Sequence, residues 1–373
     1  MALEGRELRS KIDVNGTLTL SLEFAKIDAP GDDEVVIHIE AAPINPSDLG
    51  LLLGPADLST MRILEGRNGI SFTVPEDKLS AVKGRIGQSL PVGVEGAGTV
   101  VAAGRNAKAL DGRLVGVASG GTFADYRKVS ARDVVPLPAG VTAAAGASMF
   151  VNPLTALSFV ETARRERHKA IIHTAAASNL GQMLQKVCLA DDIPLVNIVR
   201  SAEQVEILKN IGAVHILNSR DPDFINQLQD AVEATGATVA FDAIGGGSMA
   251  TQILEAMEAV ATRSMVDYSR YGSDEMKRLY IYGVLDHSLV VLNSRRFGFE
   301  WSVSGWLLLP FLARAGKEVA ERLRQRVADE LTTTFASHYS HVIGLAQALE
   351  PDVLRAYEKK ATGEKFLIDP SRG

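Results

Sequence analysis

The stretch "IIHTAAASNLGQMLQ", residues 171–185, has the form of a strand, a turn and the start of a helix. A short apolar run leads into a loop of small side chains, and an amphipathic segment follows. A dinucleotide-binding turn usually carries three glycines at this place, and only Gly181 is present. The apolar residues of the helical segment share one face and are predicted to pack on a sheet. They are Leu180, Met183, Leu184, Val187 and Cys188.

The requirements of a bound phosphate can be met by this loop despite its missing glycines. Small side chains let the backbone N–H groups at a helix start approach a pyrophosphate. We expect Ser178 to cap the helix, and Asn179 to adopt a positive φ, which Asn tolerates better than most residues. The predicted cofactor contacts are Ala177, Ser178, Asn179 and Leu180. From this stretch alone, an ordinary strand–turn–helix without a ligand remains an open alternative.

Short apolar strands alternate with helical segments from about residue 141 onward. This alternation predicts a doubly wound parallel sheet, an α/β fold. The predicted strands are 170–174, 194–200, 214–218, 239–245 and 279–284. Cys188 is predicted to be a core residue.

The residue that ends the second of these strands indicates which nucleotide is preferred. Folds that prefer NAD place Asp or Glu about 20 residues beyond the loop glycines. Here Arg200 stands 19 residues after Gly181, and a guanidinium favours the 2′-phosphate of NADPH. Ser201 is a predicted cofactor contact and, with Gln204, a capping box. An ordinary surface arginine is the alternative.

The first 140 residues are rich in glycine and proline and predict an irregular, partly open β-barrel. Residues 33–44 alternate in a half-buried strand pattern, and 96–104 and 112–119 are further short strands bounded by glycines. After Trp306 comes an amphipathic helix, and the chain ends in a strand that can return to the first domain. We therefore predict one domain from 1–140 and 308–373, and a second from 141–307.

Composition excludes several classes of protein. A chain of 373 residues is too long for one core, and a net charge of −6 argues against nucleic acid as a partner. The single cysteine excludes an intrachain disulfide and fits a reducing compartment. The N-terminus is charged, and the most apolar run, 305–316, is shorter than the roughly 18 residues of a membrane span. We predict a cytoplasmic protein without a membrane partner.

Several short motifs together resemble the medium-chain dehydrogenase/reductase superfamily, in its zinc-free quinone oxidoreductase and enoyl reductase branch. The resemblance implies a GroES-like β-barrel catalytic domain built from both chain ends, a Rossmann domain between them, and a homodimer. The motifs are "AAPINPSDLG" (41–50), "PVGVEGAGTVVAAG" (91–104), "GGTFADY" (120–126), "NPLTAL" (152–157), residues 171–185, "FDAIGG" (241–246) and "ATGEKFLI" (361–368).

The resemblance also indicates which metal ligands are missing. Zinc-bearing relatives have Cys and His where this chain has Asn45 and Val94, and the chain lacks a four-cysteine structural zinc lobe. His338 and His341 are spaced for opposite faces of a strand, and we predict no metal site.

The nicotinamide end of the site follows from the resemblance as well. It implies Asn45, Thr155, Ala243, Ile244, Tyr282 and Gly283 as contacts in the cleft. Lys365 is implied as a partner of a phosphate or a ribose. Asp242, Asn152 and Asp48 are either structural or part of this site.

Without a Lewis acid, conjugated acceptors that delocalise charge are favoured over simple carbonyls. We expect a zinc-independent NADPH:quinone oxidoreductase. The alternatives are an NADPH-dependent enone or 2-enoyl thioester reductase, and an NADPH-binding structural or regulatory protein with little turnover.

The sequence does not mark a proton donor. Enoyl reductases of the branch use a Tyr soon after the first motif, and this chain has none from Leu49 through Thr122. Quinone reduction can take protons from water, with Asn45 and Ser47 as the catalytic residues that orient the acceptor. Residues 61–89 are expected to form a lid or rim over the cleft, or a solvated surface insertion. No function is assigned to 267–272.

Overall fold

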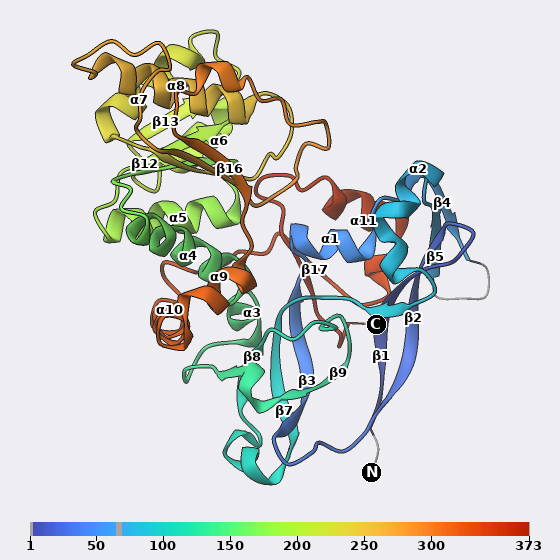
Figure 1. The fold of residues 1–373 in the computed structure, drawn as a ribbon. Helices are drawn as coiled ribbons and strands as arrows, with labels where there is room; N and C mark the ends of the chain where they lie inside the picture. Colours follow the sequence, from blue (N-terminus) through green and yellow to red (C-terminus); the bar gives the residue numbers. More distant parts are fainter. Residues whose placement is uncertain (1–2, 65–68, 373) are drawn as a thin grey trace. The chain divides into compact units, whose positions relative to one another are not determined.

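A computed structural model describes residues 3–64 and 69–372 of the chain, which divides into two units (Figure 1). The first unit consists of Met1–Val151 and Ala328–Gly373, and the second of Asn152–Val327. They are called the barrel unit and the nucleotide unit below.

The nucleotide unit contains a six-stranded sheet in which all neighbouring strands are parallel. Its order, β13-β12-β11-β14-β15-β16, is that of a dinucleotide-binding fold. The strands are β11 (Ile171–Thr174), β12 (Leu195–Val199), β13 (His215–Asn218), β14 (Val239–Asp242), β15 (Lys277–Ile281) and β16 (Trp301–Gly305).

Helices cover both faces of this sheet, with α4 and α5 on one side and α7 and α8 on the other (Figure 1). The apolar face predicted for α5 is buried, Cys188 included, and burial raises the pKa of its thiol. The helices are α4 (Val151–Arg165), α5 (Asn179–Ala190), α6 (Ala202–Lys209), α7 (Phe224–Thr235), α8 (Met249–Arg263), α9 (Leu308–Ala315) and α10 (Lys317–Asp329).

The five strands predicted from the sequence all occur, and the sixth, β16, was not predicted. Its sequence, "WSVSG", carries two serines, and its last two residues are exposed at the edge of the sheet. The strand therefore lacks the apolar run that revealed its buried neighbours.

The barrel unit contains two further sheets. One has the order β4-β5-β2-β1-β6, and the other β10-β8-β7-β3-β18-β17, with β9 also paired to β3. The strands are β1 (Leu3–Ile12), β2 (Thr17–Ile27), β3 (Glu34–Pro43), β4 (Asp57–Ile63), β5 (Gly69–Thr73), β6 (Ser89–Pro91), β7 (Gly96–Ala103), β8 (Leu114–Val117), β9 (Tyr126–Ser130), β10 (Val134–Pro136), β17 (His341–Ile343) and β18 (Phe366–Ile368).

Both ends of the chain contribute to the barrel unit, as predicted. The final strand, β18, pairs antiparallel with β3, so that Leu367 lies opposite Pro43. Helix α11 (Pro351–Glu358) adds Leu354 and Tyr357 to the same core.

Residues 61–89 differ from the expected lid or surface insertion. Strand β5 pairs with β2 and extends a sheet of the barrel unit, and Ile70 and Phe72 are buried in the core. Helix α2 (Glu76–Leu79) and a 3-10 helix at Ser80–Arg85 follow. The part of this prediction that concerns residues 65–68 lies outside the described residues. The inserted length is thus used for a strand and its packing.

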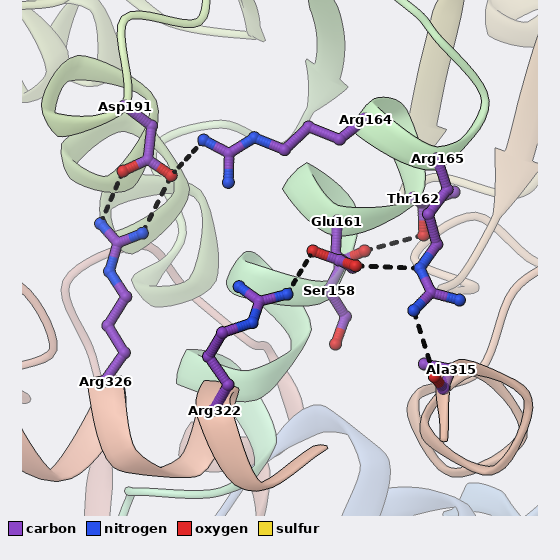
Figure 2. A network of polar contacts seen from close by, with 9 residues as sticks. All are labelled: Ser158, Glu161, Thr162, Arg164, Arg165, Asp191, Ala315, Arg322 and Arg326. Carbon is purple, nitrogen blue, oxygen red and sulfur yellow. Dashed lines mark hydrogen bonds and ion pairs between the residues drawn. The ribbon is translucent and has the colours of Figure 1, made fainter. Parts of the chain in front are cut away.

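The observed division of the chain also differs from the predicted boundaries of 140 and 308. Helices α9 and most of α10 belong to the nucleotide unit, where two carboxylates each bind two arginines (Figure 2). All four pairs have N–O distances of 2.9 Å. They are Asp191 with Arg164 and Arg326, and Glu161 with Arg165 and Arg322. Two of these arginines lie on α10, which explains why that helix stays with the unit.

The extra stretch 267–272 leads into a buried ion pair within the nucleotide unit. Lys277 is fully buried, and its Nζ lies 2.7 Å from Glu258 Oε2 and 2.8 Å from Ser273 Oγ. Gly272 has φ 82°, and a Cβ there would lie 2.3 Å from Glu258 Oε1. The stretch therefore ends on a structural contact, while Tyr268 and Tyr271 are exposed.

Within the described residues, one helical stretch is long and apolar enough to cross a membrane by length and composition. It is Ala143–Arg165, and 72% of its apolar window is buried inside the protein, as in the core helix of a folded domain. This stretch differs from residues 305–316, the most apolar run expected from the sequence. The cytoplasmic location stays a prediction.

Candidate functional site

The turn between β11 and α5 is built as a helix start. Ser178 is the N-cap, and its Oγ accepts a hydrogen bond from the Gly181 N–H at 3.2 Å. Ala176 and Ala177 are buried, so the loop approaches the sheet closely. The predicted cap is confirmed.

The predicted positive φ of Asn179 is wrong. Asn179 is already the first residue of α5, and the left-handed residue of the turn is Ala175, with φ 51°. The chain reverses at once after β11 ends at Thr174, so the strained position falls four residues earlier than expected. An alanine in this conformation costs on the order of 1 kcal/mol and persists where its surroundings hold it.

The one glycine of the turn stands where no side chain fits. A Cβ on Gly181 would lie 2.1 Å from the Ala176 carbonyl oxygen, which is backbone and cannot rotate away. In dinucleotide-binding folds the third glycine serves this close packing of helix and strand. The turn therefore has glycine at the position where packing requires it, and small residues at the other positions where such turns usually have glycine.

Arg200 follows β12 directly, as predicted. Its side chain is exposed, and within the described part of the chain its guanidinium makes no hydrogen bond or ion pair. Ser201 caps α6 and accepts from the Gln204 N–H, while Gln204 Oε1 accepts from the Arg200 N–H at 2.9 Å. The predicted Ser201 cap is thus present, but the second bond of the capping box is not formed as predicted, because the Gln204 side chain binds the Arg200 N–H and not the Ser201 N–H.

The turn after β14 is held by a carboxylate, so Asp242 is structural. Asp242 accepts hydrogen bonds from Thr174 Oγ1 and from the N–H groups of Ile244 and Gly245. Thr174 Oγ1 in turn accepts from the Ala243 N–H at 2.8 Å. These bonds link the carboxyl ends of β11 and β14.

The carboxyl ends of β14 and β15 also touch. A Cβ on Gly283 would lie 2.7 Å from the Ala243 carbonyl oxygen, so only glycine fits this close approach of two backbones. Ala243 is buried, and Ile244 and Gly283 are partly exposed. The predicted contacts in these two turns are therefore neighbours.

Tyr282 points toward the interior of the nucleotide unit. Its hydroxyl lies 2.8 Å from His173 Nε2, and the two rings are stacked. Burial raises the pKa of Tyr282 and lowers the pKa of His173 to about 3, so both are neutral at pH 7. His173 Nδ1 is buried without a hydrogen-bond partner among the described residues. His173 is a functional candidate that the sequence did not reveal, since it lies in an apolar strand.

Parallel strands end at one edge of their sheet, so these turns lie along one edge of the nucleotide unit. That edge collects the predicted contacts Ala177, Ser178, Asn179, Leu180, Arg200, Ser201, Ala243, Ile244, Tyr282 and Gly283. Thr155 is a buried residue of α4 in the same unit.

The predicted residues of the barrel unit form a second group. Asn45 caps α1 (Pro46–Leu52) and is 2% exposed; its Nδ2 donates to Glu95 Oε1 at 2.8 Å, and its N–H donates to Asp48 Oδ2 at 2.7 Å. Asn45 Oδ1 and Asp48 Oδ1 are buried without hydrogen-bond partners among the described residues. Ser47 is exposed on the first turn of α1.

Glu95 is the centre of this group. Its carboxylate is fully buried and accepts from Asn45 Nδ2 and from the N–H groups of Phe150 and Val151, the latter two at 2.9 Å. Burial raises the pKa of Glu95, and the charge of Lys365 opposes the rise. Burial likewise raises the pKa of Asp48 to about 7.

Lys365 donates to Ser148 Oγ at 2.8 Å and to Ser337 Oγ at 3.4 Å. Ser148 Oγ lies 2.8 Å from the hydroxyl of Tyr339. Asn45, Asp48, Glu95, Ser148, Tyr339 and Lys365 are called the barrel polar cluster below. Only part of the cluster is predicted from the sequence, because no motif marks Ser148 or Tyr339.

Metal ligands do not gather in the described residues: no group of three or more His, Cys, Asp or Glu side chains there could hold a metal ion. His338 is exposed, and the exposed His341 stacks on Phe366 with ring centroids 4.4 Å apart.

The sheet order and the arrangement of turns are those of a dinucleotide-binding fold, and comparison with known proteins agrees. Residues 31–139 match the family described as alcohol dehydrogenase GroES-like domain, and 179–302 match the family described as zinc-binding dehydrogenase. The chain belongs to the medium-chain dehydrogenase/reductase superfamily, in its quinone oxidoreductase and enoyl reductase branch.

Individual relatives are distant. The chain is 29% identical over 262 residues to a mitochondrial enoyl-[acyl-carrier-protein] reductase of Xenopus tropicalis, covering 67% of this chain and 65% of that protein. It is 25% identical to prostaglandin reductase-3 of Bos taurus, covering 63% of this chain and 54% of that protein. The chain thus spans less than two thirds of the length of these relatives.

A solved structure is similar over almost the whole chain. It is that of a candidate NADPH:quinone reductase of Mesorhizobium loti, with a TM-score of 0.73, 27% identity and 98% of both chains covered.

Proposed function

We propose that this protein is an NADPH-dependent reductase of conjugated acceptors. One observation carries the proposal: the turns after β11, β12, β14 and β15 present a capped helix start, an exposed guanidinium and a closely packed backbone along one sheet edge. Ligands of such sheets bind at the carboxyl ends of the strands.

The turn after β11 fits a pyrophosphate. Small buried alanines precede the N-terminus of α5, where backbone N–H groups and the helix dipole favour an anion. Ala177, Ser178, Asn179 and Leu180 are the proposed contacts. Arg200, with Ser201 beside it, is the proposed partner of the 2′-phosphate, because a guanidinium binds phosphate oxygens through paired N–H donors.

The nicotinamide end is proposed to involve Thr155, Ala243, Ile244, Tyr282 and Gly283. Asn45 Oδ1 is a buried acceptor without a partner among the described residues, which suits an amide N–H donor such as a carboxamide. Lys365 is proposed to bind a ribose hydroxyl or a phosphate, because its two serine contacts use two of three ammonium protons. When bound, NADPH supplies the hydride.

A quinone is the proposed acceptor, reduced without zinc, since Asn45 stands where zinc-bearing relatives have Cys. Asn45 and Ser47 are proposed to orient it. An enone or a 2-enoyl thioester is the second candidate, favoured by the names of the enoyl reductase and prostaglandin reductase relatives.

The protein is further proposed to be a cytoplasmic homodimer. Apolar side chains in residues 284–292 of the nucleotide unit are exposed, with Leu289 at 88% and Val291 at 55%. Exposed apolar segments of this kind mark interaction surfaces. Light scattering after gel filtration should give the mass of two chains, and a single-chain mass would refute the dimer.

The test of the function is NADPH oxidation against a panel of quinones, enones and crotonyl thioester. Fastest turnover of a quinone supports the first candidate, and fastest turnover of crotonyl thioester or an enone supports the second. Tight NADPH binding without turnover of any acceptor would contradict the proposed activity and favour a structural or regulatory NADPH-binding protein.

A further inference from the structure

Three polar side chains of the barrel polar cluster are linked by hydrogen bonds. Lys365 Nζ donates to Ser148 Oγ at 2.8 Å, and Ser148 Oγ lies 2.8 Å from the Tyr339 hydroxyl. Ser148 is 1% exposed, while Tyr339 and Lys365 are partly exposed. A buried hydroxyl therefore connects two groups that can each exchange a proton with their surroundings.

The fold places Tyr339 and Lys365, the two ends of this hydrogen-bonded series, side by side. Tyr339 precedes β17 and Lys365 precedes β18, and these strands pair in parallel. The Ser340 N–H donates to the Lys365 carbonyl oxygen at 3.0 Å, and the Lys365 N–H donates to Ser340 Oγ at 3.0 Å. Lys365 Nζ lies 5.4 Å from the centre of the Tyr339 ring.

The donors and acceptors define a direction. An ammonium can only donate, so Ser148 Oγ accepts from Lys365. Either hydroxyl of the Ser148–Tyr339 pair can be the donor, so Ser148 is able to give its own proton to the Tyr339 oxygen. When Ser148 is the donor of this pair, Tyr339 accepts and its own O–H can donate to a bound acceptor. Protons can move from Lys365 through Ser148 to Tyr339.

The carboxylates near Lys365 favour its protonated form. Burial lowers the pKa of Lys365 to about 8, and the carboxylates of Glu95 and Asp48 oppose the fall. Burial raises the pKa of Tyr339, as does the charge of Glu95, so Tyr339 keeps its proton until a base of higher affinity forms. The aromatic ring of Tyr339 faces the same ammonium.

We propose that Tyr339 is the catalytic acid of the reaction, with Ser148 and Lys365 as positioning residues that return its proton. This rests on the proposed function. Hydride transfer from NADPH adds two electrons and one hydrogen to the conjugated acceptor and leaves an anion. The Tyr339 O–H bond breaks and its proton joins that anion; Ser148 then passes a proton to the phenolate and takes one from Lys365. Lys365 recovers a proton from water.

The first test compares Tyr339→Phe with the wild type on the fastest acceptor of the panel. We expect kcat to fall about 100-fold, the usual range for loss of a general acid, while the NADPH dissociation constant stays within about twofold, far below that effect. The control is Tyr126→Phe, a partly buried tyrosine of the same unit outside the cluster, which should keep the wild-type kcat.

The second test examines the pH profile. Wild-type kcat should fall above the Lys365 pKa of about 8, because the neutral amine of Lys365 cannot return a proton to Ser148. Lys365→Met should lower kcat and lose this alkaline limb, and Lys365→Arg should do the same, because a guanidinium does not release its proton in a protein. Ser148→Ala should lower kcat, with partial recovery in Ser148→Thr.

The outcomes separate the relay from the proposed function. Wild-type turnover that persists in Tyr339→Phe with an unchanged pH profile would refute the relay and leave the reductase standing. Tight NADPH binding with no wild-type turnover would refute the activity, and the relay with it. Loss of turnover in Tyr339→Phe with parallel loss of NADPH binding would also refute the acid role, since it indicates a binding function.

Discussion

The turn after β11 and the barrel polar cluster carry the two halves of the proposed chemistry, and they are assembled in different ways. The turn is continuous in sequence, from Ala175 to Gly181, and its properties follow from small side chains and a helix cap. The cluster draws Asn45, Glu95, Ser148, Tyr339 and Lys365 from five separate segments. A binding turn can thus be recognised from local residues, whereas a buried network depends on the finished fold.

The largest effect should come from the centre of the cluster. Glu95→Ala leaves two backbone N–H groups and the Asn45 amide without an acceptor and removes the carboxylate near Lys365. We expect a loss of about 3–5 kcal/mol in unfolding free energy, measured by urea denaturation. Glu95→Gln, which keeps one carbonyl oxygen, should lose less. Equal stability of Glu95→Ala and the wild type would show that the cluster is not a structural centre.

Arg200→Glu tests the phosphate end of the turn region. We expect the KM for NADPH to rise tenfold or more, because a charge-assisted hydrogen bond is worth about 1.5–3 kcal/mol. Steady-state kinetics with NADPH and NADH measure the effect, and the KM for NADH should change less. The control is Arg314→Glu, an exposed arginine on α9. Unchanged NADPH kinetics in Arg200→Glu would refute the assignment of Arg200 as the partner of the 2′-phosphate.

Gly181→Ala tests whether the turn depends on close packing. The added Cβ must displace the Ala176 carbonyl oxygen, and overpacking of this kind costs about 1–3 kcal/mol. We expect lower stability and weaker NADPH binding in fluorescence titrations. Gly305→Ala, where a Cβ meets nothing within 4 Å, is the matched control. Similar behaviour of the two variants would contradict the packing argument.

The smallest effect concerns Asp48 and appears only as a function of pH. Burial raises the pKa of this carboxyl to about 7, so the folded protein binds more protons than the unfolded chain between about pH 4 and 7. Stability from this group is present at low pH and lost as pH rises. Asp48→Asn lacks this loss, so its unfolding free energy relative to the wild type should increase by about 1 kcal/mol or more from pH 5 to 8. A difference that is constant across these pH values would refute the shift.

Much of the fold could be predicted from the sequence because its signals are local. The strands from β11 to β15 are apolar runs, and the buried face of α5 follows helical spacing. Strand β16 is not predicted because its serines give no apolar run. The prediction places α9 and α10 in the other domain, because their partners lie more than a hundred residues away: Glu161 and Asp191 bind α10, and Arg165 donates to the Ala315 carbonyl oxygen of α9.

The candidate site, like the fold, could be predicted from the sequence only where the signal is local. Ser178 was identified as the cap from its place before an amphipathic segment, but the left-handed residue is Ala175 and not Asn179. Residue preference alone could not locate the reversal, since the strand's end decides it. Tyr339 could not be predicted as a proton donor because it lies far from Asn45 in sequence, and only the pairing of β18 brings the C-terminal segment beside β3.

The central claim is that the chain transfers a hydride from NADPH to a conjugated acceptor. The most direct measurement is single-turnover oxidation of NADPH carrying deuterium at the transferred position, with the fastest acceptor of the panel. The proposed function predicts slower oxidation of the deuterated cofactor than of ordinary NADPH. Equal rates for the two cofactors, or no oxidation with any acceptor, would contradict it.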